Sequence, residues 1–189
     1  MKKSIGLILA LFISSLLTGQ EAGMRKVPKQ YSFETGYRRV TGTEFGNSST
    51  NGYTVLFDYA WQLSGLNGTK ASYISVPLSY TQMMPDSDTA ASVRVIGYGW
   101  TVRHELRKHS DNWVPFLGYS LMLNNYSEAG TEGRIFGHQT GFTCGLNHYG
   151  SSRFVPYFQI NYSMTNYPEW GIKGSRKYNF LEAKIGMRL

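Results

Sequence analysis

The sequence contains little cysteine and little charge. Cys144 is the only cysteine in 189 residues, so no disulfide can form within the chain. An exported domain without disulfides must be stabilised by core packing or by a membrane. Charged residues make up only 16% of the chain, and they form no Lys/Arg-rich run of the kind that binds nucleic acids. Low charge combined with 14 Tyr and 21 Gly argues against a disordered chain and against a helical bundle.

Long apolar runs are also missing, except at the N-terminus. Lys2 and Lys3 precede an apolar run from Ile5 to Leu17, and small polar residues follow it. This order is typical of a secretory signal peptide, and the run is short for a membrane-spanning helix. We expect residues 1–22 to form a signal peptide, cleaved between about residues 19 and 22, and residues 23–189 to form one domain. The alternative is a retained N-terminal anchor. A lipoprotein is excluded because no cysteine lies near the cleavage region.

The rest of the chain alternates between apolar and small or polar residues with the period of two that marks half-buried strands. In the clearest segment, Gly52 to Leu63, Tyr, Val, Phe, Tyr, Trp and Leu occupy every second position. No segment after the signal shows a convincing helical period. Pro77 lacks an amide donor, so we expect a bulge or a lost ladder hydrogen bond there. The pattern predicts eight strands, at residues 30–40, 52–63, 71–82, 92–102, 113–124, 134–146, 154–163 and 178–189.

Residue size indicates which strand face meets water. The apolar face carries many Tyr, Phe, Trp and Leu, which is more volume than the interior of an eight-stranded barrel can hold. The opposite face is rich in glycine, which weakens a water-facing strand but leaves space for larger neighbours inside a narrow barrel. We therefore predict an all-β, eight-stranded, antiparallel, up-and-down transmembrane β-barrel whose apolar face meets lipid. A sandwich and a soluble lipocalin-like periplasmic barrel are the alternatives.

The chain resembles the small outer-membrane β-barrels of the outer-membrane protein A/X type. The resemblance rests on the signal, the eight segments and a last strand, 178–189, that ends on an apolar residue. Members of this family commonly end on an aromatic residue, whereas this chain ends on Leu189. The resemblance implies the outer membrane of a diderm bacterium, periplasmic termini, short periplasmic turns and longer outer loops. Those loops would be residues 41–51, 83–89, 124–133 and 165–177, and the periplasmic connection 103–112 would be unusually long.

Charged residues on the polar face of three strands predict an interior ion-pair network. Unpaired charges in a narrow lumen cost several kcal/mol, so three acids and three bases should pair there. Strands one and eight must meet when a barrel closes, so Arg38 should approach Glu182 and Glu34 should approach Lys184. The network is either a structural plug or the lining of a narrow pore, and its members are Glu34, Arg38, Asp58, Glu182, Lys184 and Arg188.

Aromatic residues on the apolar face are expected to contact lipid. Tyr53 and Trp61 lie at opposite ends of one strand, where interfacial aromatic girdles belong. The full set of expected lipid-facing aromatics is Tyr53, Phe57, Tyr59, Trp61, Tyr98, Trp100, Tyr119 and Tyr162.

A catalytic site is not expected, although one pair of residues requires comment. His138 and Thr140 vaguely resemble the His-x-Ser pair of outer-membrane lipid A deacylases, and they share the outward face, as a base and a nucleophile must. Thr replaces Ser, however, and only Glu128 or Glu132 could act as the orienting acid, from a loop. The other three histidines lack metal-ligand spacing. We expect no metal and no cofactor.

The sequence therefore predicts a monomeric outer-membrane barrel with a structural or adhesion role through its outer loops. Its expected partners are outer-membrane lipid, the barrel-insertion machinery and an extracellular ligand of the loops, and nucleic acid is not among them. A narrow pore, a lipid A-modifying enzyme and the soluble periplasmic barrel remain as alternative functions.

Overall fold

The fold of the protein is a single closed sheet of eight strands. The computed structural model describes residues 29–41, 50–65, 70–85, 92–108, 112–128, 135–150, 153–168 and 176–189. The expected signal peptide lies outside these residues. The strands are β1 (Lys29–Thr41), β2 (Asn51–Ser64), β3 (Ser72–Met84), β4 (Val93–Glu105), β5 (Trp113–Glu128), β6 (Ile135–His148), β7 (Val155–Tyr167) and β8 (Arg176–Arg188).

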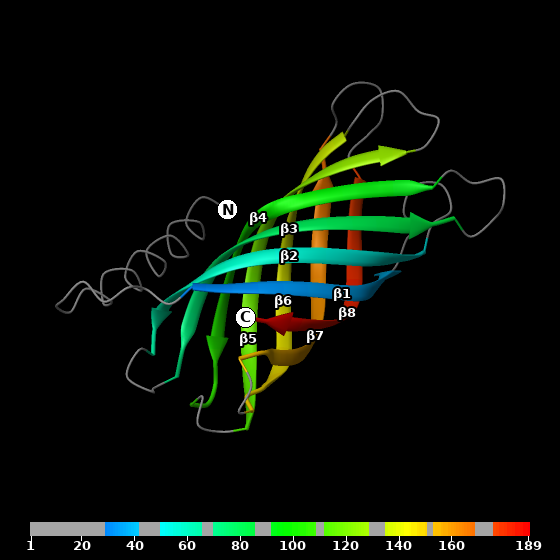
Figure 1. Cartoon of the computed structure of the whole chain (residues 1–189). Coiled ribbons are helices and arrows are strands. Elements are labelled where there is room, and N and C mark those ends of the chain that lie inside the picture. The colour runs from blue at the N-terminus through cyan, green and yellow to red at the C-terminus, as the bar shows by residue number, and fades with distance from the viewer. Residues whose placement is uncertain are drawn as a thin grey trace.

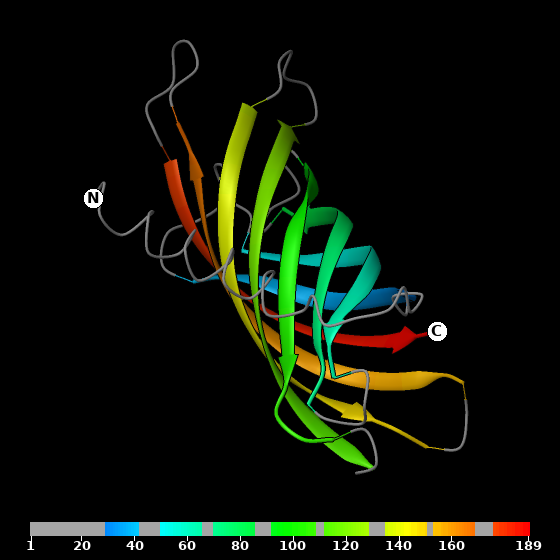
Figure 2. The same ribbon diagram turned by 90° about the vertical axis from the view of Figure 1, so that its left-hand side faces the viewer.

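Every strand pairs antiparallel with its neighbours in sequence, and β8 pairs with β1 to close the barrel. Figures 1 and 2 show the tilted strands curving around one axis. The first residue of β1 and the C-terminal residue Leu189 lie at the same end, which we call the terminal end, and the opposite end is the far end. Backbone hydrogen bonds between Tyr31 and Leu189 fasten the two chain ends together. The predicted all-β, eight-stranded, up-and-down barrel is confirmed.

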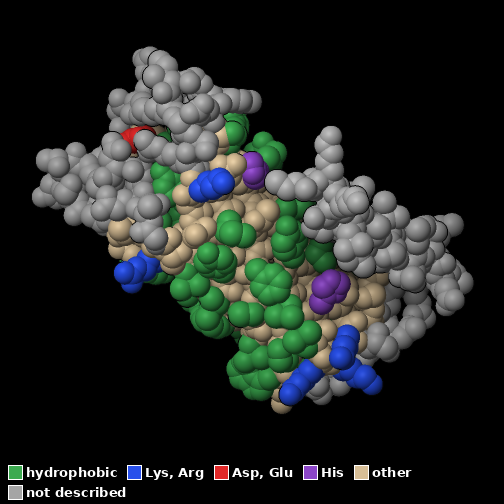
Figure 3. Space-filling view, turned by 180° about the vertical axis from the view of Figure 1, so that it is seen from behind, with side chains coloured by type: hydrophobic (Ala, Val, Ile, Leu, Met, Phe, Trp, Pro, Cys, Tyr) green, Lys and Arg blue, Asp and Glu red, His purple; other side chains and the backbone are tan. Residues whose placement is uncertain are grey.

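The apolar face of the strands is the outside of the barrel. Along β2, Tyr53, Val55 and Phe57 are exposed while Thr54 and Leu56 are buried in the lumen. The same alternation runs through the other strands, so large apolar side chains are exposed on all eight of them. Figure 3 shows one side of this apolar band. A soluble lipocalin-like barrel needs the opposite arrangement, with its apolar side chains inside.

Glycines on the lumen face make room for larger residues, as the sequence predicts. A Cβ on Gly36 would lie 2.5 Å from Cγ of Lys184, and a Cβ on Gly186 would lie 2.5 Å from the ring of Tyr157. Near the far end, a Cβ on Gly137 would meet the ring of Tyr167 at 2.5 Å. These glycines let long side chains from neighbouring strands cross the lumen.

Pro77 interrupts one ladder, as expected. The β3–β4 pairing skips Val76 and Pro77 opposite Gly99 and Trp100, and it resumes with the same register at Leu78 and Tyr98. Proline has no amide hydrogen to donate to the ladder, so this local gap follows from its chemistry. The register between β2 and β3 also shifts, at Gln62/Ser64.

Several strands are longer than the sequence pattern indicates. β4 continues to Glu105, β5 to Glu128 and β7 to Tyr167, each beyond its predicted end. The far-end connections are therefore residues 42–50, 85–92, 129–134 and 168–175, and the terminal-end connections are 65–71, 106–112 and 149–154. The two sets are similar in length, so the expected contrast between short turns and long loops is weak.

Among the described residues, no helix has the length and apolar character needed to cross a membrane.

Candidate functional site

The lumen is the most distinctive polar region of the described structure. All six residues of the expected interior network are buried in it. Two further charged side chains, Arg103 and Glu105, are also buried there, because β4 extends into the segment expected to be a turn. Extending the alternation of β4 past its predicted end at residue 102 would have placed both residues on the lumen face. The buried charges are four acids and four bases: Glu34, Asp58, Glu105, Glu182, Arg38, Arg103, Lys184 and Arg188.

An ion cluster in the middle of the lumen joins β1 to β8. Arg38 forms a buried salt bridge with Glu182, the pair expected from barrel closure. Lys184 Nζ lies 3.0 Å from Glu182 Oε2 and 3.9 Å from Glu34 Oε2. Lys184 thus lies between two carboxylates and is nearer to Glu182 than to its expected partner, Glu34. Opposite charges stand next to each other along the seam that closes the barrel.

Neutral side chains supply the remaining hydrogen bonds of these carboxylates. Tyr157 donates to Glu34 Oε1 at 2.6 Å, and Gln159 Nε2 donates to Glu34 Oε2 at 2.7 Å. Asn161 Nδ2 donates to Glu182 Oε2 at 2.8 Å. A buried carboxylate is tolerated when its lone pairs are satisfied in this way. The arrangement holds both acids in fixed positions.

A layer of arginines and aromatic rings fills the lumen near the terminal end. The guanidinium of Arg103 lies 4.4 Å from the ring centroid of Tyr73, and that of Arg188 lies 3.8 Å from that of Tyr157 and 5.0 Å from that of Phe116. Cations over aromatic faces are attracted by the ring quadrupole, most strongly when desolvated. Arg103 also donates to Gln30. This layer places two guanidinium groups and three rings in the lumen at this end.

Glu105 receives hydrogen bonds beside the same layer. Asn147 Nδ2 donates to Glu105 Oε1 at 2.8 Å, and the hydroxyl of Tyr149 donates to the same oxygen at 2.6 Å. Tyr149 lies in the connection after β6, where burial and then the nearby Tyr73 and Glu105 raise the pKa of its phenol. The phenol therefore stays protonated and remains a donor to Glu105.

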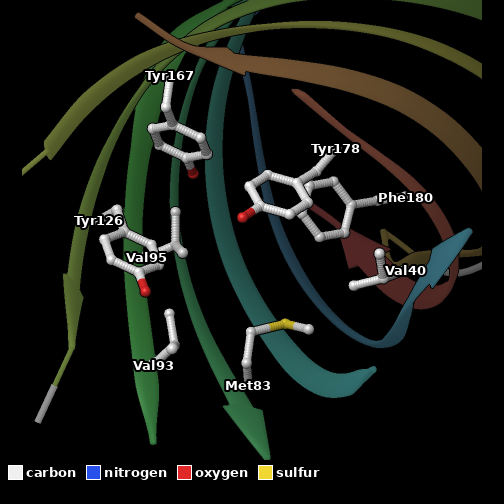
Figure 4. Close-up of a cluster of buried hydrophobic side chains, with 8 residues drawn as sticks. All are labelled: Val40, Met83, Val93, Val95, Tyr126, Tyr167, Tyr178 and Phe180. Carbon is white, nitrogen blue, oxygen red and sulfur yellow. The ribbon is translucent and has the colours of Figure 1, made fainter. Parts of the chain in front are cut away.

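An apolar cluster lines the lumen at the far end. Figure 4 shows its side chains pointing inward from strands around the barrel. β2 and β6 contribute glycines instead, Gly52 and Gly137, which would clash with Met83 and Tyr167 if they carried a Cβ. We call this group the far-end cap, and it consists of Val40, Met83, Val93, Val95, Tyr126, Tyr167, Tyr178 and Phe180.

Little open space remains between these layers. The described lumen side chains line a partly open cavity of about 50 Å³, and Asp58, Arg103 and Lys184 are among them. This volume holds roughly three to five water molecules. Asp58 Oδ1 and Arg103 Nε are buried without a protein hydrogen-bond partner, so they are natural partners for such waters. The described side chains thus fill much of the lumen.

All eight expected lipid-facing aromatics point out of the barrel. Six of them are exposed, whereas Tyr59 and Trp61 are half-buried because they pack on each other, with ring centroids 4.5 Å apart. Tyr31 packs on Tyr59 in turn. Trp61 lies near the terminal end and Tyr53 near the far end, which are the two places where interfacial girdles form.

His138 and Thr140 share the outer face of β6 and line one surface groove with Trp100 and Leu121. No described acidic side chain lines this groove, and Glu128 accepts a hydrogen bond from Tyr126 instead. Glu132 and His109 lie outside the described residues. Of the other histidines, His104 hydrogen-bonds to Ser72 and His148 packs on Trp113. The described part of the chain holds no group of three or more residues suited to a metal ion.

No protein-family model matches the sequence, and no curated protein matches it either. Solved structures do match its fold. Neisserial surface protein A aligns with a TM-score of 0.61 and 13% identity, covering 85% of this chain and 96% of that protein. The N-terminal β-barrel domain of Pseudomonas aeruginosa OprF aligns with a TM-score of 0.50 and 11% identity, over 85% of this chain and 97% of that domain. The outer-membrane enzyme PagL aligns with a TM-score of 0.50 and 12% identity, over 85% and 98%.

These similarities extend over nearly the whole described barrel, and the identities are too low to carry over any activity. The apolar exterior agrees with them, because it is the surface that such a barrel presents to lipid. The chain therefore has the closed eight-stranded barrel fold of the small outer-membrane proteins of Gram-negative bacteria.

Proposed function

We propose that this outer-membrane barrel is closed to solutes and has a structural or surface-binding role through its far-end connections. The observation that carries the proposal is the filled lumen. The arginine–aromatic layer, the central ion cluster and the far-end cap lie one above another, and the described lumen side chains line a cavity of about 50 Å³. A barrel whose interior is packed acts through its outside and its ends.

The orientation in the proposal follows from the chain ends. β1 begins and β8 finishes at the terminal end, because an even number of strands returns the chain to the side of the barrel where it began. In the proposal the terminal end faces the periplasm. The four connections at the far end, residues 42–50, 85–92, 129–134 and 168–175, are then displayed outside the cell.

The two rival functions are less well supported by the described residues. A pore would require Arg103, Arg188 and the far-end cap to leave the lumen together. A lipid-modifying enzyme would use His138 and Thr140, but the groove that they line contains no described acid to orient the histidine. The fold shared with PagL does not distinguish between these functions, because one fold hosts many functions.

A complementation experiment tests the proposal. In a strain lacking the protein, we would express the wild-type protein or a variant whose residues 42–49, 86–91, 129–134 and 169–175 are replaced by Gly/Ser segments of equal length. The matched control replaces residues 66–69 and 109–111 at the terminal end. Adhesion to a surface coated with extracellular-matrix protein and resistance to detergent are measured for each strain.

Two results support the proposal. Loss of adhesion in the far-end variant alone assigns a binding role, and loss of detergent resistance in the deletion strain, restored by both variants, assigns a structural role. If the deletion instead changes solute uptake or lipid A acylation and leaves adhesion and detergent resistance intact, the proposal is wrong. In that case His138→Ala, with lipid A analysed by mass spectrometry, separates the enzyme from the pore.

A further inference from the structure

No described acidic side chain is exposed, whereas the described bases lie both in the lumen and on the exposed surface. Four of the five described acids are buried in the lumen, and the fifth, Glu128, is half-buried at the far end. Basic side chains, in contrast, are exposed at the ends of the apolar band (Figure 3). Those at the terminal end, which we call the basic ring, are Lys29, Lys70, Arg107, Lys108 and Arg153.

The basic ring extends all the way around the barrel. Lys29 opens β1, Lys70 lies in the β2–β3 connection, Arg107 and Lys108 lie in the β4–β5 connection and Arg153 lies in the β6–β7 connection. Each connection at this end therefore carries at least one exposed base. The described residues place no exposed acid at this end to neutralise them.

Apolar side chains stand beside the members of the ring. Trp61 is directly opposite Lys29 in the β1–β2 ladder. Leu106 precedes Arg107 and Phe154 follows Arg153 in the sequence, and both of these apolar side chains are exposed. Bases next to aromatic and aliphatic groups are typical of a membrane interface, where the apolar group reaches the acyl chains and the base reaches the headgroups.

We propose that the basic ring binds the phosphate groups of anionic phospholipids in the leaflet that surrounds the terminal end. The shape of the ring selects this partner. A protein that docks sideways would be matched by a patch on one side of the barrel, whereas lipid headgroups contact every side at one level. Because each base near an anionic surface attracts anionic headgroups, a few of them acting together concentrate anionic lipid around this end. This inference does not depend on the role of the far-end connections.

Tryptophan quenching tests the proposal on the intact barrel. The background variant Trp100→Phe/Trp170→Phe keeps Trp61 and Trp113, both near the terminal end. It is refolded into phosphatidylcholine vesicles that contain dibrominated phosphatidylglycerol, or dibrominated phosphatidylcholine for comparison. The ratio of quenching gives the relative affinity of the two lipids at this end. We expect a preference for the anionic lipid of roughly five-fold, reduced by 0.5 M salt.

Two triple variants with equal charge change locate the binding groups. Lys29→Gln/Arg107→Gln/Arg153→Gln removes three members of the ring and should bring the preference to about one-fold. Arg39→Gln/Arg94→Gln/Lys177→Gln removes three exposed bases at the far end and should leave the preference unchanged. Equal preference in all three proteins would overturn the proposal.

A different partner gives a different result. The barrel in detergent is mixed with purified cell-wall sacculi, and its sedimentation with them is measured. If the ring variant loses this binding but keeps the lipid preference of the background protein, the ring binds a cell-wall polymer and the lipid proposal is wrong. Gel mobility with and without heating confirms that each variant is folded before either measurement.

Discussion

At the scale of single residues, the lumen shows how a narrow barrel accommodates charge. Glu182 is paired with Arg38 and Lys184 and also accepts a hydrogen bond from Asn161. A buried ion pair of this kind adds little net stability compared with an apolar pair of the same shape, yet removing one member is costly because the other charge is left without a partner. Removing a single charge of the Glu182 cluster is therefore expected to destabilise the barrel, although the cluster itself contributes little net driving force to folding.

Glu182→Gln is expected to lower the free energy of unfolding by roughly 3–5 kcal/mol, because Arg38 and Lys184 lose the carboxylate between them. Urea unfolding in lipid vesicles, followed by tryptophan fluorescence, measures the change. Glu128→Gln is the control, since Glu128 is half-buried at the far end, and it should change stability by less than about 0.5 kcal/mol. Equal effects of the two substitutions would contradict the role assigned to the ion cluster.

At the scale of strands, side-chain parity carried most of the information in the sequence. Alternation identified all eight strands and their outward faces, because a period of two is strictly tied to the faces of a sheet. It did not locate the strand ends. In the sequence, Arg103 and Glu105 look like members of a charged turn. In the closed barrel, β4 continues through both residues, because the lumen supplies Gln30 as a partner for Arg103 and Asn147 as a partner for Glu105.

The same limit applies to the ion cluster. The pairing of Arg38 with Glu182 could be predicted, because closure places β1 beside β8 in a known direction. The position of Lys184 between two carboxylates could not, because it depends on how the long lysine side chain passes Gly36. The far-end cap was also missed. Three of its members, Met83, Tyr126 and Tyr167, come from segments that were expected to be loops, and the other five lie in the predicted strands but were not recognised as a cluster.

Gly186→Ala tests whether lumen glycines in β8 set the packing of neighbouring strands. The new Cβ would lie 2.5 Å from the ring of Tyr157, which hydrogen-bonds to Glu34. Overpacking of this kind is expected to cost about 1–3 kcal/mol. Gly118→Ala on the same face is the control and should cost less, because its Cβ would come no closer than 3.2 Å to any neighbour. Unfolding midpoints in urea distinguish the two variants, and a reversed order would show that the packing argument is wrong.

At the scale of the whole molecule, the layers of side chains in the lumen predict a protein that does not conduct ions. In planar lipid bilayers, the refolded barrel should give no steady conductance steps, because the proposal has the far-end cap and the arginine–aromatic layer close the path on either side of a cavity of about 50 Å³. A variant with Arg103→Ala, Arg188→Ala, Tyr178→Ala and Phe180→Ala opens both layers and serves as the positive control. Steady steps from the wild-type protein would contradict the closed-barrel proposal.

The ion cluster between β1 and β8 also has a consequence for biogenesis. Arg38 and Glu182 are 144 positions apart, and the charges of β1 acquire their β8 partners only when the last strand arrives. A chain truncated before β8 would keep an open sheet edge and would hold Glu34 and Arg38 without their counter-ions. Such a chain would be costly to leave in lipid. We therefore expect stable insertion to require the last strand, because its arrival closes the sheet and supplies the counter-ions of Glu34 and Arg38.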